Sequence, residues 1–173
     1  MRYLLLTLTV FLLLAVQAPL LRVLGIEHYS IDAALVAILY LAATASGSAG
    51  LIAASAIGFM ADAFAAGGIL GMNMEILVIM YLLGLGLAAR FHLMSAVPLV
   101  MVALLCSVTQ MLLFFLFSVL FDRGFGSSTR MLLEAIPHAL LTSMFAPILF
   151  PLFSLIDRGT RGRRPGSDGV LLR

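Results

Sequence analysis

The chain has 173 residues, of which 63% are hydrophobic and only 10% are charged, and its mean hydropathy is +1.18. An ordinary soluble domain is about 45–50% apolar and about 25% charged, so this sequence has too little polar surface to cover a water-soluble particle. The composition excludes a soluble enzyme, a secreted disulfide scaffold, a nucleic-acid-binding module and a disordered regulator. It predicts a protein embedded in the lipid bilayer.

Six apolar runs follow one another along the chain, and each is a candidate for crossing the roughly 30 Å of bilayer hydrocarbon. Lipid offers no hydrogen-bond partners to an unpaired backbone, and the runs lack the alternation of barrel strands. We therefore expect an all-α, polytopic fold with six transmembrane helices. Residues 1–157 would form this domain, with spans at about 3–21, 32–45, 49–65, 73–90, 94–121 and 131–156.

The positions of the arginines predict the topology. With six spans and both termini in the cytoplasm, seven arginines lie on the cytoplasmic side and three on the outer side, as the positive-inside rule requires. Fusing the second and third runs into one long span would move the arginine-rich end outside, which makes that alternative weaker. We expect residues 158–173 to form a disordered cytoplasmic tail that anchors this topology, with binding to anionic lipid as the alternative role.

The absence of lysine and of a second cysteine excludes several kinds of catalytic and structural site. All ten basic residues are arginine, so the chain can form no lysine Schiff base with retinal or pyridoxal phosphate and can build no P-loop. Cys106 is the single cysteine, which excludes an intrachain disulfide and a multi-cysteine metal site. Because Cys106 lies inside an apolar run, we expect a small buried residue rather than a reactive thiol.

The segment 47–71 carries the most informative pattern. Ala54, Gly58 and Asp62 follow one another at four-residue spacing and therefore share one helix face, where small residues let a second helix approach closely. An ionised carboxylate in hydrocarbon costs at least about 2.5–3.5 kcal/mol, so Asp62 should face protein. Two interpretations fit equally well: a docking site organised by Asp62, or an acid at a helix end that contacts water. The glycines that follow predict a tight connection: Gly67, Gly68 and Gly71.

Other polar and small residues predict packing rather than chemistry. Gly84 and Gly86 form a second small-residue patch in the fourth span, and we expect it to pack against the first patch. Gln17 and Gln110 lie within spans and should form interhelical hydrogen bonds. The three histidines fall in different segments without a second ligand at helical spacing, which argues against a metal site.

The chain lacks the patterns of intramembrane catalysis and of ion-driven transport. A rhomboid-type protease needs Gly-x-Ser-Gly, and the segment 46–50 does not fit this motif. An aspartyl protease needs two aspartates on adjacent helices, whereas only Asp62 lies near a span interior. Ion-driven transporters bury several ionisable groups near the midplane, and this chain has almost none there. We therefore predict a protein that is not an enzyme and uses no cofactor.

The length, the six predicted spans and two segments are similar to one known family. The first segment is Gly-Phe-Met-Ala-Asp at 58–62, followed by Gly67-Gly68 and Leu70-Gly71, and the second is the proline-bearing end of the last span at 151–157. Together they resemble the rod shape-determining protein MreD family. In that family a Gly-x-x-x-Asp element, a small-residue turn and a Leu-Gly pair recur in the middle of the chain, and a basic tail follows the final helix.

The resemblance implies a non-catalytic inner-membrane protein of the bacterial cell-elongation machinery. Such proteins bind the single-span partner MreC and, with it, couple the MreB filament to the peptidoglycan polymerase and transpeptidase. The hypothesis is that the third and fourth spans present a grooved surface to a partner's transmembrane helix. The docking residues would be Gly58, Asp62, Gly67, Gly68 and Gly71, and the helix-packing residues Ala54, Gly84 and Gly86.

An alternative comes from another class of protein. The substrate-binding subunits of energy-coupling-factor transporters are also six-span proteins of this size, are similar in build to MreD, and hold a vitamin between helices and outer loops. Those proteins often carry Ala-x-x-x-Ala in the first span, whereas Ala15 and Ala18 have a different spacing here. The chain also has no tryptophan to contact a ligand. Partner docking is therefore the prediction, and vitamin binding the alternative.

Overall fold

The structure, a computed structural model, describes residues 2–24, 31–45, 47–64, 71–91, 93, 95–121 and 128–161. This part of the chain is all-helical, as predicted, and each helix covers one of the six apolar runs. The helices are α1 (Arg2–Leu24), α2 (Ala33–Thr44), α3 (Gly47–Phe64), α4 (Met72–Ala88), α5 (Ala96–Phe121) and α6 (Ser128–Arg161). Because α6 continues to Arg161, the first four residues of the expected tail are helical, and 162–173 lie outside the described residues.

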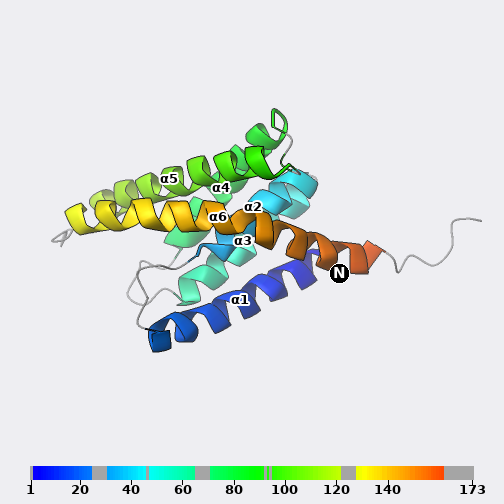
Figure 1. Cartoon of the computed structure of the whole chain (residues 1–173), viewed down its shortest axis with the longest axis horizontal. Helices are drawn as coiled ribbons and strands as arrows, with labels where there is room; N and C mark the ends of the chain where they lie inside the picture. The colour runs from blue at the N-terminus through cyan, green and yellow to red at the C-terminus, as the bar shows by residue number, and fades with distance from the viewer. Residues whose placement is uncertain are drawn as a thin grey trace, which may run out of the picture.

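The helices form one bundle, elongated along the direction of α5 and α6 (Figure 1). Consecutive helices pack against each other as α1 with α2, α2 with α3, α3 with α4, α4 with α5 and α5 with α6. The start of α1 and the end of α6 lie at the same end of the bundle, which we call the termini end. The opposite end, where α3 ends and α4 begins, is the far end.

Three helices of the described part are long and apolar enough to cross a membrane: Gly47–Phe64, Ala96–Leu120 and Ile136–Arg158. The other apolar stretches are shorter, and α2, with 12 residues, is only about 18 Å long at 1.5 Å per residue. Large apolar side chains on the outer faces of the long helices are more than half exposed, among them Met101, Leu105, Leu112, Met144 and Ile148. Such faces suit contact with lipid rather than water.

The short helix α2 forms the centre of the bundle. It packs against all five other helices, and its residues 33–42 are all buried. This explains why α2 reads as a continuous apolar run without a polar face. The core of the bundle contains large, fully buried side chains from three helices: Tyr40 of α2, Tyr81 of α4 and Phe153 of α6. The predicted buried state of Cys106 is confirmed, since it is 2% exposed.

Candidate functional site

The carboxylate of Asp62 joins the end of α3 to the start of α4. Its Oδ2 accepts the backbone N–H groups of Gly71 and Met74 at 3.0 and 3.2 Å. Its Oδ1 accepts both the backbone N–H and the side-chain Nδ2 of Asn73, each at 2.9 Å. The first N–H groups of a helix have no partner within the helix, and its N-terminus favours negative charge. Asp62 therefore caps α4 from a neighbouring helix.

The cap is supplied from α3 because the residue in the capping position cannot supply it. Gly71 adopts φ +99°, a left-handed conformation that favours glycine, and has no side chain to accept a hydrogen bond. Asp62 is only 7% exposed, so the interpretation of an acid that contacts water is wrong. Its predicted role in docking remains a prediction, and Gly67 and Gly68 lie outside the described residues.

Gly58 brings the backbones of α3 and α4 into contact. A Cβ atom at this position would lie 2.5 Å from Cα of Met74 and 3.1 Å from its backbone nitrogen. Ala54, one turn earlier on the same face, is fully buried. The stripe of small residues predicted from the sequence is thus a helix-packing face, and α3 uses it against α4 of the same chain.

The second small-residue patch does not pack against the first, contrary to expectation. A Cβ atom at Gly84 would lie 2.9 Å from Cβ of Ala42, so Gly84 faces α2. Gly86 is exposed, and nothing lies within 4 Å of where its Cβ would be. Residues 84 and 86 are about 200° apart around a helix, and the two glycines consequently face a buried helix and the outside of the bundle.

At the far end, a cavity of about 230 Å³ lies between helix ends, lined by polar and apolar side chains. Asp32 caps its own helix, α2, by accepting the backbone N–H of Leu35 at 2.8 Å, and Nε2 of Gln110 donates to its second oxygen at 2.5 Å. The backbone N–H of Asp32 donates to Oγ1 of Thr142 on α6 at 3.1 Å. Gln17 of α1 donates to the carbonyl of Ile31 at 2.6 Å.

Sequence reasoning found part of this cluster. Gln17 and Gln110 were predicted to form interhelical hydrogen bonds: Gln110 of α5 bonds Asp32, the N-cap residue of α2, and Gln17 of α1 bonds the carbonyl of Ile31, which precedes α2 and is not helical. The cavity itself was missed, although the polar residues in otherwise apolar runs were a signal for it. Two buried polar atoms in its wall have no hydrogen-bond partner in the part of the chain that the structure describes: Oε1 of Gln110 and Nδ1 of His138.

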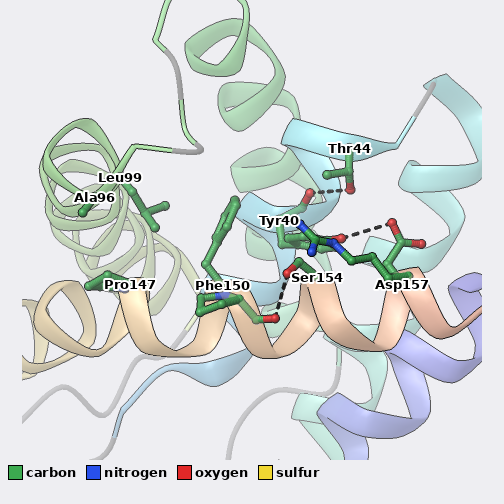
Figure 2. Close-up of a pocket in the computed structure, with 10 residues that line it drawn as sticks. Tyr40, Thr44, Ala96, Leu99, Pro147, Phe150, Ser154 and Asp157 are labelled. Carbon is green, nitrogen blue, oxygen red and sulfur yellow. Dashed lines mark hydrogen bonds between the residues drawn. The ribbon is translucent and has the colours of Figure 1, made fainter.

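A second pocket, of about 510 Å³, lies toward the termini end between α2, α5 and α6 (Figure 2). Tyr40 of α2 and Asp157 of α6 point toward each other in it, and the Tyr40 hydroxyl donates to Oδ2 of Asp157 at 3.1 Å. Thr44 and Ser154 donate their hydroxyls to backbone carbonyls of their own helices, each at 2.8 Å.

Comparisons with family models, with curated proteins and with solved structures find no match to this chain. The described residues contain no group of three or more histidine, cysteine, aspartate or glutamate side chains that could hold a metal ion. The polar side chains brought together at the two ends of the bundle bind one another and the backbone.

Proposed function

We propose that this chain is a non-catalytic component of the bacterial cell-elongation complex, which docks the transmembrane helix of MreC on the outward face of α3 and α4. Through MreC it helps couple MreB filaments to the peptidoglycan polymerase and transpeptidase and so maintains rod shape. The chain lies in the inner membrane with six passes and both termini in the cytoplasm. The resemblance of residues 58–71 to the MreD family supports this identity.

The tight α3–α4 pair is the observation that carries the proposal. Asp62 and Gly58 fix the two helices against each other, and their polar and small groups are used within the chain. The surface left for a partner is apolar, with Ile52 and Phe59 exposed on α3 and the small residue Gly86 exposed on α4. Close packing at small residues is the main way in which membrane helices associate.

In this mechanism the residues of the pair divide into two roles. We assign Gly86 to the surface that meets the partner helix; a Cβ atom added there would have nothing of this chain within 4 Å. Gly58 and Asp62 act as positioning residues, since they set the relative placement of α3 and α4 without touching the partner. α2 and α4 are short for a span; α2 packs against all five other helices, and the bilayer can thin locally where a span is short.

Co-purification with tagged MreC from bacterial membranes tests the proposal. Gly86→Leu should reduce the yield of the complex at unchanged expression and unchanged thermal stability, because the new side chain fills the partner's place on an open surface. Gly58→Leu and Asp62→Leu should reduce complex yield and stability together. Leu112→Ala, at an exposed site of α5, is the control and should leave the yield unchanged. Wild-type yield in all three α3–α4 variants would show that the partner does not dock there.

The same pull-down distinguishes the docking function from the alternative, which is vitamin binding as a transporter subunit. Identification of a transporter energy-coupling module instead of cell-wall proteins would favour a vitamin-binding subunit. The far-end cavity is the place where such a subunit would hold its ligand. At about 230 Å³ this cavity is below the roughly 300–1,000 Å³ of pockets for drug-sized molecules, whereas the termini-end pocket of about 510 Å³ is within that range, so the pull-down and not pocket size decides between the two functions.

A further inference from the structure

We propose that the far-end cavity is a binding site for a primary ammonium group, carried by a small soluble amine or by a lipid headgroup. The site lies on other residues than the docking surface, and it stands whether or not MreC is the partner. Its walls come from several helices that meet only in the folded bundle, including α2, α5 and α6. The cavity has three features that suit such a ligand: its place between helices, its unpartnered polar atoms and the charge of its described lining residues.

Two buried polar atoms in the wall of this cavity have no hydrogen-bond partner among the described residues. Gln110 is 5% exposed, and because its Nε2 donates to the Asp32 carboxylate, the other amide atom must be the oxygen, which is unpartnered. Nδ1 of His138 is also buried without a partner. Gln110 lies eleven residues before the end of α5 and His138 ten residues after the start of α6. α5 and α6 run in opposite directions side by side (Figure 1), and both Gln110 and His138 line the same cavity.

A primary ammonium is the donor that matches this wall. It carries three N–H groups and no acceptor, so it can donate to Oε1 of Gln110, to Nδ1 of His138 when the ring proton is on Nε2, and to a free lone pair of the Asp32 carboxylate. A buried acceptor left unsatisfied destabilises the fold, and a bound ammonium would relieve that cost.

The charges around the cavity select a cation over an anion. Among the lining residues that the structure describes, Asp32 is the one acidic side chain and none is arginine. Phe64 also lines the cavity, and an aromatic ring attracts a cation that lies over its face. The volume of about 230 Å³ limits the bound part to an ammonium with a few further heavy atoms.

Equilibrium dialysis of the purified protein against radiolabelled ethanolamine tests the site. We expect saturable binding of one molecule per chain, displaced by ethylamine but not by ethylene glycol or acetate. His138→Phe keeps the ring and removes the acceptor, and it should weaken binding about tenfold or more, as the loss of one hydrogen bond to a charged group requires. Ala61→Leu, which fills the cavity without removing a polar group, should abolish binding, whereas the exposed control Leu112→Ala should not change it.

Lipid nanodiscs distinguish the two sources of the ammonium. If the ligand is a headgroup, phosphatidylethanolamine should raise the unfolding temperature above that in phosphatidylcholine, whose methylated nitrogen has no N–H, and His138→Phe should remove the difference. If the ligand is a soluble amine, ethanolamine should bind in both lipids alike. The proposal is overturned if neither lipid nor soluble amine has an effect, which would mean that the cavity holds water only, or if His138→Phe binds as well as the wild type.

Discussion

Replacement of Asp62 by leucine should be among the most destabilising single changes in this chain. The carboxylate accepts four hydrogen bonds at the start of α4, three of them from backbone N–H groups. Leucine has a similar bulk but no acceptor. The four donors would therefore lose their partner at a buried site, since Asp62 is 7% exposed in the wild type.

The size of the effect follows from the groups that lose a partner. A hydrogen bond to a charged group contributes about 1.5–3 kcal/mol, and loss of an N-terminal cap alone costs about 0.5–2 kcal/mol. Because the start of α4 can relax toward solvent, we expect less than the sum over all four hydrogen bonds, about 3–5 kcal/mol. For a chain of this length each kcal/mol shifts the unfolding temperature by about 2–4 °C, so it should fall by about 6–20 °C. Asp62→Asn, which keeps one carbonyl oxygen, should give an intermediate loss.

Thermal unfolding in detergent, combined with hydrogen exchange, measures this prediction. The amides of Asn73 and Met74 should exchange faster in Asp62→Leu, because both lose their acceptor. Glu75→Gln is the matched control: it removes an exposed acid from the first turn of the same helix and should cost less than about 1 kcal/mol. If Asp62→Leu unfolds within about 2 °C of the wild type and the two amides keep their protection, then the carboxylate does not hold α4.

Three further changes test the packing. Gly58→Ala should destabilise by about 2–4 kcal/mol, because its Cβ would meet the backbone of α4 and that helix cannot move like a side chain; Gly84→Ala, opposed by the side chain of Ala42, should cost less. Gly86→Ala should leave stability equal or raise it by up to about 1 kcal/mol, since alanine favours a helix and has open space. Tyr40→Phe should cost about 1–2 kcal/mol by removing a donor to the buried Asp157 carboxylate. Unfolding temperatures measured in one detergent would rank all four, and equal losses for Gly58→Ala and Gly86→Ala would contradict the assigned packing.

The features set by local sequence could be predicted. Each helix follows from an apolar run, and the Asp32 cap of α2 follows from a capping residue before such a run. The four-residue spacing of Ala54, Gly58 and Asp62 predicted a close helix contact, and the structure has it. These inferences hold because helix periodicity fixes which side chains share a face before any tertiary contact forms.

The features set by contacts between distant segments could not be predicted. Spacing shows that Gly84 lies on a face but not which helix will meet it, and the partner is Ala42 of α2. Asp157, taken as a span end, is buried because Tyr40, 117 residues earlier, lies against it. The central place of α2 was hidden for the same reason, since an apolar run looks alike whether lipid or protein surrounds it.

The way in which the polar groups are satisfied constrains any docking mechanism. Asp62 has four donors within the chain, so a partner helix that used its carboxylate would have to break the cap of α4 first. A partner can instead gain its contact energy from apolar and small side chains on the outside, where Gly86 has open space. Gly58 and Asp62 variants should therefore lose both stability and docking. Gly86 variants should lose docking and keep their stability. That separation distinguishes a residue that shapes the surface from one that belongs to it.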